Sequence, residues 1–194
     1  NPSFVDGQVI LIHQSRGTGV GAWELNKIAS YIPGSITTVS PLKATYVDSG
    51  ASQAQVRVVP QYRDVLITSG STWSAKFWNG DVGGILAFLS SGTTVIDGVI
   101  EASRRGFSQG TVEGGQGEGT AGPRNTVSCI ENGNGGGGGQ RGSDSLGGGG
   151  GGNGSMGQGG HSRASHCGGY GGYTNPDQTL SAMYFGGGGG AGAG

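Results

Sequence analysis

The side chains of this sequence that could do chemistry are few and stand apart. His13 closes an apolar stretch, and the carboxylates of the first part of the chain occur singly: Glu24, Asp64, Asp81, Asp97 and Glu101. Glycosidic chemistry needs two carboxylates that face one bond from opposite sides. A hydrogen-bonded structural histidine and turn-forming aspartates, such as Asp97 before Gly98, are the simpler interpretation. The sequence therefore predicts no catalytic site and no enzyme activity.

Metal and cofactor sites are not expected either. Gly-x-Gly patterns are frequent in the second half of the chain, but a phosphate cradle needs such a loop between a strand and a helix, followed by a lysine or an acidic partner. Glu118, Glu131 and Asp144 are too sparse for a calcium loop, which needs several carboxylates. We expect no metal and no cofactor.

The two cysteines, Cys129 and Cys167, bracket a glycine-rich stretch. A bond between them would stabilise the folded chain by about 3 to 4 kcal/mol, because it restricts the unfolded chain. Two alternatives stay open: a pair of buried free thiols, or a metal site that includes His161 and His166, although that spacing fits no standard zinc pattern. We predict the disulfide.

Composition excludes two classes of partner. The chain has 194 residues, of which 32% are hydrophobic and 12% charged, with a net charge of −1; charged residues make up about a quarter of ordinary globular proteins. Without a basic patch we expect no nucleic-acid partner, and without an apolar run of about 20 residues we expect no membrane insertion. The low charge, the predicted disulfide and a start without methionine indicate a secreted or cell-surface protein.

Residues 1–61 read as a small antiparallel β-unit. Apolar stretches at residues 9–12, 23–29, 36–39 and 54–59 are separated by glycine, proline and serine. A helix is an alternative only for residues 22–31, where the apolar spacing is ambiguous.

Residues 62–113 contain very short apolar stretches that end in Ser-Gly or Asp-Gly. The expected strands cover residues 65–68, 85–89, 93–96 and 99–102. Short strands separated by such turns are typical of the rungs of a β-solenoid or the hairpins of a β-sandwich, and we favour stacked rungs.

Residues 114–194 hold most of the 47 glycines, including uninterrupted runs at 135–139, 147–152 and 186–190. An extended left-handed helix with about three residues per turn has no internal hydrogen bonds, so its N–H and C=O groups point outward. Without side chains, neighbouring glycine helices can approach closely and bond to each other. We predict a bundle of polyglycine II helices, with a flexible linker or glycine-rich hairpins as alternatives.

Three parts of the sequence carry a resemblance that covers most of the chain. The segment Trp78-Asn79-Gly80-Asp81-Val82-Gly83-Gly84-Ile85-Leu86-Ala87-Phe88 is similar to bacterial secreted glycine-rich surface proteins, and so are Leu180, Met183, Tyr184 and Phe185 before the last glycine run. The preceding β-domain of those proteins is matched by Gln14, Gly17, Gly19, Gly21, Trp23, Glu24, Pro41, Leu42, Tyr46, Val59, Pro60, Gln61 and Tyr62. The resemblance implies a β-domain followed by a polyglycine-rich tract and implies no particular activity. The glycine tract alone also resembles glycine-rich domains of phage tail-fibre adhesins and of the anaplastic lymphoma kinase receptor family.

The aromatic side chains have two possible roles. Trp23, Trp73 and Trp78 could form a sugar-binding face, but we expect them in the core, where they would compensate for the low aliphatic content. Tyr170, Tyr173 and Tyr184 are candidates for contacts between chains.

The favoured hypothesis is a structural protein that assembles with itself into an extracellular filament or surface layer. We expect identical subunits to join head to tail through open backbone edges at the two termini. The residues expected at this contact are Asn1, Pro2, Phe4, Val5, Tyr184, Phe185, Gly186 and Gly190. The alternative is an adhesin or binding module that recognises a surface glycan or protein through its glycine-rich loops.

Overall fold

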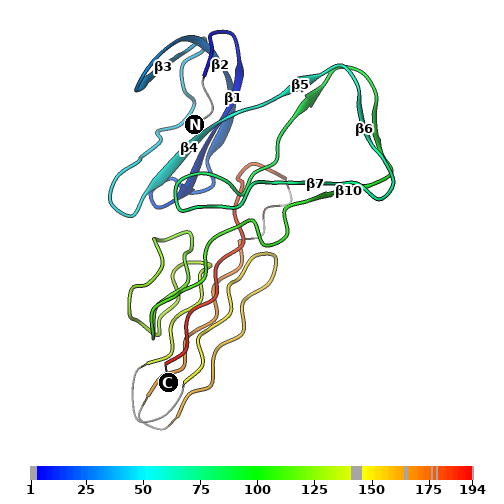
Figure 1. The fold of residues 1–194 in the computed structure, drawn as a ribbon. Helices are drawn as coiled ribbons and strands as arrows, with labels where there is room; N and C mark the ends of the chain where they lie inside the picture. The colour runs from blue at the N-terminus through cyan, green and yellow to red at the C-terminus, as the bar shows by residue number, and fades with distance from the viewer. Residues whose placement is uncertain (1–3, 141–145, 164–165, 176, 178, 194) are drawn as a thin grey trace.

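The computed structural model describes residues 4–140, 146–163, 166–175, 177 and 179–193, so Asn1, Pro2 and Asp144 lie outside the described residues. In the described ranges the chain consists of β-strands and extended segments and contains no helix. Figure 1 shows three parts: a curled sheet at the N-terminus, a small coil of strands beside it, and a long glycine-rich segment that leads away from both.

The sheet has four antiparallel strands, β1 (Val9–Arg16), β2 (Trp23–Ile32), β3 (Ser35–Thr38) and β4 (Gln53–Val58), in the order β3-β2-β1-β4. The predicted antiparallel β-unit is confirmed, and the helical alternative for residues 22–31 is wrong. Along β2, Glu24, Asn26 and Ile28 are buried while the residues between them are exposed. This alternation is the period of a strand, and pairing with β1 fixes it.

Both faces of β1 are covered. Ile10 and Ile12 pack with Ile28 inside the curl of the sheet. Leu11 lies on the opposite face, in a second cluster with Val59, Trp78, Ile85, Phe107 and Phe185. The members of this second cluster come from all three parts of the chain, so the main apolar core lies where the parts meet.

The coil consists of two stacked turns of chain. The first rung (residues 61–74) contains β5 (Gln61–Tyr62), β6 (Val65–Ile67) and β7 (Thr72–Ser74); the second rung (residues 89–101) contains β8 (Leu89–Ser90), β9 (Thr94–Ile96) and β10 (Val99–Glu101). The strands pair in parallel, β5 with β8, β6 with β9 and β7 with β10. Parallel pairing in register is what stacked rungs require and what sandwich hairpins lack.

Local details of the coil differ from the prediction. Residues 85–88 form no strand, and the ladder begins at Leu89. Ile85 belongs to the apolar core instead. At the turns of the second rung, a Cβ on Gly92 would overlap Asp64, and one on Gly98 would overlap the carbonyls of Thr68 and Ser71. Glycine is needed at these two turns because the rungs are stacked so closely.

The glycine segment (residues 106–193) consists of extended passes of chain held together by backbone hydrogen bonds. The three glycine runs lie side by side, as predicted: Gly136 N–H donates to Gly188 at 2.9 Å, Gly149 to Gly137 at 2.8 Å, and Gly190 to Gly149 at 2.8 Å. The passes run lengthwise along the segment in Figure 1.

These hydrogen bonds recur every third residue. Gly149 and Gly152 donate to one neighbouring pass, at Gly137 and Asn134. Gly150, between them, donates to a different pass, at Gln158. A backbone with a period of three therefore shares its polar groups among several neighbours, unlike a strand, whose groups point to two sides.

Cys129 and Cys167 form the predicted disulfide, with their Cα atoms 6.1 Å apart. Both cysteines are therefore used, which excludes the free thiols and the metal site that included them. The bond lies within the glycine segment and ties two of its passes together.

A buried carboxylate joins the three parts of the chain. Glu118, in the glycine segment, forms an ion pair with Arg16 of β1. Its other oxygen accepts hydrogen bonds from the Trp78 indole N–H at 2.8 Å and the Ser108 N–H at 3.2 Å. Arg16 also donates to the carbonyls of Ala51 and Gly80. The buried charges are thus paired and hydrogen-bonded, which offsets the cost of removing them from water.

The close approach of the glycine passes predicts a large effect of one added side chain. A Cβ on Gly149 would overlap the carbonyl of Tyr170, whereas a Cβ on Gly154 would meet nothing within 4 Å. We expect Gly149→Val to destabilise the protein by about 3 kcal/mol or more, since it separates passes and leaves backbone groups unpaired. Gly154→Val is the control and should change stability little. Denaturant unfolding measures both, and equal midpoints would contradict the packing.

The buried ion pair predicts a second effect on stability. Glu118→Gln leaves the Arg16 guanidinium buried without a counter-charge, so we expect a loss of about 3 to 5 kcal/mol. The control is Asp64→Asn, which removes a carboxylate from the exposed pair with Arg63 and should cost less than about 1 kcal/mol. Calorimetric or chemical unfolding distinguishes the two, and a neutral Glu118→Gln would show that the ion pair is dispensable.

Candidate functional site

Among the residues expected to form an assembly surface at the termini, those that the structure describes are not brought together. Phe4 packs edge-on against Tyr31, with ring centroids 5.6 Å apart, on the inner face of the curled sheet. Val5 is 56% exposed. Phe185 is buried in the other apolar cluster, on the opposite face of β1, and Tyr184 beside it is half-buried.

The last glycine run is hydrogen-bonded to four neighbouring passes of the glycine segment. Gly190 donates to Gly149, and the Gly186 carbonyl accepts from Phe107. Gly188 both donates, to Glu118, and accepts, from Gly136. The run is nevertheless not paired on every side, because the N–H groups of Gly186, Gly189 and Gly192 donate no backbone hydrogen bond within the described residues. The expected unpaired face is therefore reduced to this one row of N–H groups. Deletion of the run would remove a whole pass of the segment and not merely a contact between subunits.

Longer open backbone edges occur on the two stacked rungs. Each pair of strands is a two-stranded sheet, so every strand of the coil is paired on one side only. The outer edge of β8, β9 and β10 is named here the second-rung edge. Half of the N–H and C=O groups of these strands point away from the first rung, as in any edge strand.

The second-rung edge carries exposed apolar side chains. Ile96 is opposite Ile67, which is buried inside the coil, but Ile96 itself is 51% exposed. Ile100, opposite Trp73, is likewise exposed, and Val99 is 50% exposed. The interior of the coil is therefore uncovered at its second rung.

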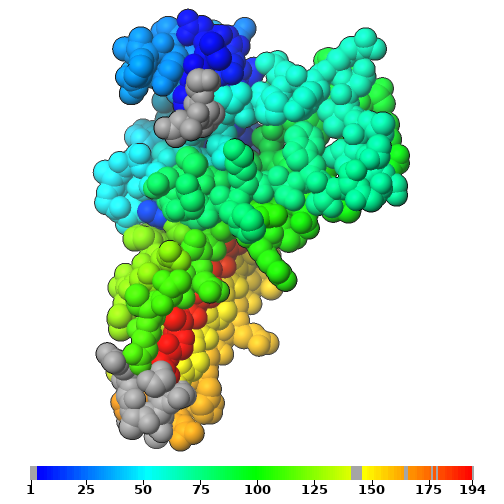
Figure 2. All heavy atoms as spheres, in the orientation of Figure 1, coloured from blue at the N-terminus to red at the C-terminus, as the bar shows by residue number. Residues whose placement is uncertain are grey.

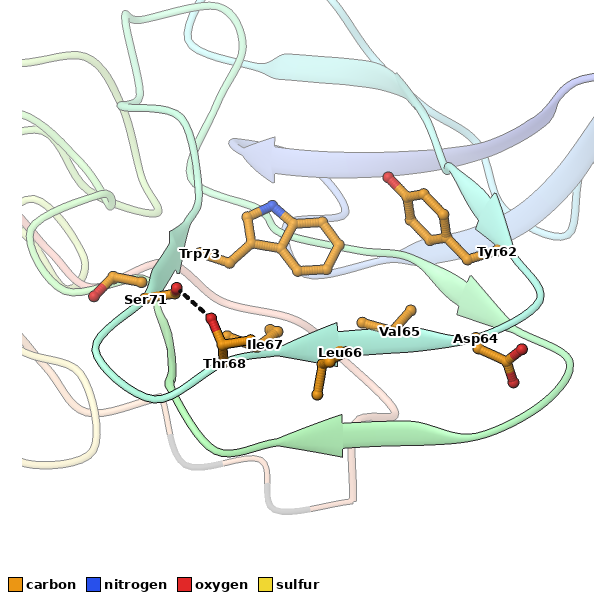
Figure 3. A pocket seen from close by; sticks show the side chains of 9 residues that line it. Tyr62, Asp64, Val65, Leu66, Ile67, Thr68, Ser71 and Trp73 are labelled. Atoms are coloured by element: carbon orange, nitrogen blue, oxygen red, sulfur yellow. Dashed lines mark hydrogen bonds between the residues drawn. The ribbon is translucent and has the colours of Figure 1, made fainter.

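The other end of the coil contains a hollow of about 450 Å³, named here the first-rung hollow. Figure 2 shows the first rung facing the viewer at the right of the molecule. Val65 and Ile67 point into the hollow from β6, and Tyr62 and Trp73 lie across it (Figure 3). Thr68 and Ser71 stand at its margin, with their hydroxyl oxygens 2.8 Å apart.

Three aromatic rings contact one another beside the hollow, and two of them line it. Trp73 stacks on Phe88 with centroids 4.9 Å apart and an interplanar angle of 29°. Tyr62 meets Trp73 edge-on at 6.2 Å and 75°. Trp73 lines the hollow and Phe88 does not.

The expectation that all three tryptophans belong to the core holds for two of them. Trp78 is buried, and Trp23, which is half-buried, packs against the same apolar cluster. Trp73 is also half-buried but lines the hollow and does not belong to that cluster. The sequence does not distinguish Trp73 from the other two tryptophans. Its exposure arises because no further rung in the described part of the chain covers the first rung.

The buried histidine has a structural environment. His13 is fully buried and stacks on Phe185 with centroids 5.2 Å apart. Its Nε2 lies 2.8 Å from the Met183 carbonyl, which can only accept, so we assign the proton to Nε2. Nδ1 then accepts from the Ser15 hydroxyl at 3.0 Å, and Ser15 accepts from Gln55. Every polar atom in this chain of bonds is used within the protein.

Metal and membrane features can be stated for the described ranges alone. No cluster of three or more His, Cys, Asp or Glu side chains in these ranges could hold a metal ion. None of the described residues belongs to a helix with the length and apolarity needed to cross a bilayer.

The environment of His13 predicts that acid destabilises the fold. Burial lowers the pKa of His13 below its usual value of 6.5, and the bond to the Met183 carbonyl opposes this shift only in part. Below pH 6.5 the unfolded chain therefore binds a proton at His13 that the folded chain does not. Stability should be constant above this pH and fall as the pH drops below it, until the folded histidine is also protonated.

Denaturant unfolding between about pH 8 and pH 5.5 measures this dependence, above the range in which most carboxylates titrate. In the His13→Gln variant, the unfolding free energy should decrease less over this pH range than in the unmodified protein, whatever the variant's absolute stability. An equal decrease in both proteins would show that titratable groups other than His13 cause the pH dependence.

Comparison with known proteins finds no matching family model, no matching curated protein and no matching solved structure.

Proposed function

We propose that this chain is an extracellular structural protein whose copies assemble with one another through the second-rung edge. The observation that carries the proposal is the combination, on β8, β9 and β10, of unpaired strand edges and exposed apolar side chains. The proposal keeps the self-assembly expected from the sequence and moves the contact from the termini to the coil.

An open strand edge pairs readily with another strand unless the protein protects it. Proteins commonly place lysine, proline or a covering loop at such an edge. The second rung has no lysine or proline, and its acidic residues, Asp97 and Glu101, lie at the ends of the strands. Pairing would satisfy the outward N–H and C=O groups and cover Ile96 and Ile100 in the same contact.

The partner is a second copy of this chain. Two copies related by a two-fold axis can pair β9 with the partner's β9 in antiparallel fashion, so that each buries the same residues. Such a contact joins two molecules back to back and leaves both first-rung hollows open. Larger filaments or layers then need a further contact at another surface of the pair.

The glycine segment fits a structural role. Its hydrogen-bond period of three supports a bundle of polyglycine II helices, which have about three residues per turn. Such a bundle is held together through its backbone, with few side chains, and the disulfide adds a covalent tie. The disulfide also supports an oxidising, extracellular location.

The alternative function, a binding module that acts through glycine-rich loops, has less support. The glycine runs lie in hydrogen-bonded passes and are not free loops. Recognition by this part of the chain would have to use the side chains on its surface, such as Tyr170 and Tyr173.

Self-association is tested by light scattering over a concentration series, with electron microscopy of the associated material. We expect the intact chain to associate as its concentration rises, and Ile96→Lys to stay monomeric because it places a charge in the apolar contact. Ile32→Lys, on the exposed end of β2, is the matched control and should associate like the unmodified chain. A chain that stays monomeric at high concentration, or association unaffected by Ile96→Lys, would contradict the proposal.

A further inference from the structure

We propose that the first-rung hollow binds a neutral sugar ring, stacked on the free face of Trp73. The proposal goes beyond self-assembly, because it concerns the opposite end of the coil and a different partner. In an assembly joined at the second-rung edge, both hollows would remain open to a polysaccharide of the surrounding matrix.

The stack of aromatic rings defines a platform. Phe88 covers one face of the Trp73 indole at 4.9 Å and does not line the hollow, which leaves the other face of the indole for a ligand. A flat ring placed in the hollow would continue the stack. Tyr62, which stands edge-on to the indole and is 43% exposed, forms a wall beside it (Figure 3).

The shape and polarity of the hollow fit a sugar better than a wholly apolar ligand. Its volume of about 450 Å³ lies in the range of small-molecule sites, roughly 300 to 1,000 Å³. A pyranose ring has C–H bonds on its face and hydroxyl groups around its rim. The indole and the apolar floor of Val65 and Ile67 suit the face, and the Thr68 and Ser71 hydroxyls at the margin can bond to the rim.

The charges around the hollow favour a neutral ligand. Asp64 is the one charged side chain of its lining, and its carboxylate points away from Trp73 (Figure 3). That carboxylate is already engaged, by the Arg63 guanidinium at 2.9 Å and by the Thr93 N–H at 2.9 Å. No unused charge is therefore available to select an anion or a cation.

The three tryptophans supply a direct test by NMR, since each gives one indole N–H signal. The Trp78 indole donates to Glu118 and the Trp23 indole to the Leu180 carbonyl, so these two signals serve as internal controls. The intact, disulfide-bonded chain is titrated with cellohexaose, chitohexaose, mannohexaose and maltohexaose. Tetramethylammonium and a sulfated oligosaccharide are the charged probes.

We expect at least one neutral oligosaccharide to shift the Trp73 signal saturably while those of Trp23 and Trp78 stay in place. Tyr62→Ala, which leaves the indole to report, should weaken binding of that sugar at least tenfold. Trp73→Ala should abolish binding measured by calorimetry, and Trp73→Phe, which keeps an aromatic ring, should restore part of it. Trp23→Phe is the matched control and should bind like the unmodified chain.

Several results would overturn the proposal. One is the absence of any Trp73 shift with the neutral sugars at concentrations of several millimolar. Another is tighter binding of either charged probe than of any neutral sugar. A third is a Trp73 signal that moves with protein concentration and not with sugar, which would place a second copy of the chain in the hollow. Failure of self-association leaves these outcomes unchanged, so the two proposals are tested separately.

Discussion

The structure depends on one constraint: glycine runs without side chains must satisfy most of their backbone polar groups by bonding to one another. A buried N–H or C=O group without a partner costs about as much as a lost hydrogen bond. The passes of the glycine segment meet this requirement by bonding to several neighbours in turn. Glycine is required because a Cβ on most of these residues, such as Gly136 or Gly187, would overlap a neighbouring carbonyl.

This constraint also decides how the parts are joined. The last pass lies between others, so the segment is complete only when the C-terminal run is in place. Phe185, directly before that run, packs against Trp78 and Phe107 in the apolar core, and Met183 accepts the hydrogen bond from His13. The sheet, the coil and the glycine segment therefore share a core to which the end of the chain contributes. The two ends of the coil are left outside this network, and one of the two proposed contacts lies at each end.

Much of the fold was predictable because its signals are local. Short β-branched stretches indicated β1, β3, β4, β6, β9 and β10, and the glycine runs indicated close backbone packing. The Arg16–Glu118 pair was not predictable, since its members lie 102 positions apart and Glu118 looks like an isolated carboxylate in a glycine tract. The neighbours of the C-terminal run were not predictable, because the sequence does not tell which passes lie beside it. For the same reason the sequence does not tell that Trp73 lines a hollow, since this depends on its position in the first rung.

Amide hydrogen exchange of the glycine segment tests the central claim most directly. If the passes are bonded as described, the N–H groups of Gly149, Gly152, Gly187 and Gly190 should exchange far more slowly than that of Gly154, which lies on an exposed turn. Protection that recurs along each run and is lost together on unfolding would support a single hydrogen-bonded body. Exchange of all these glycines at the rate of an unfolded chain would contradict it.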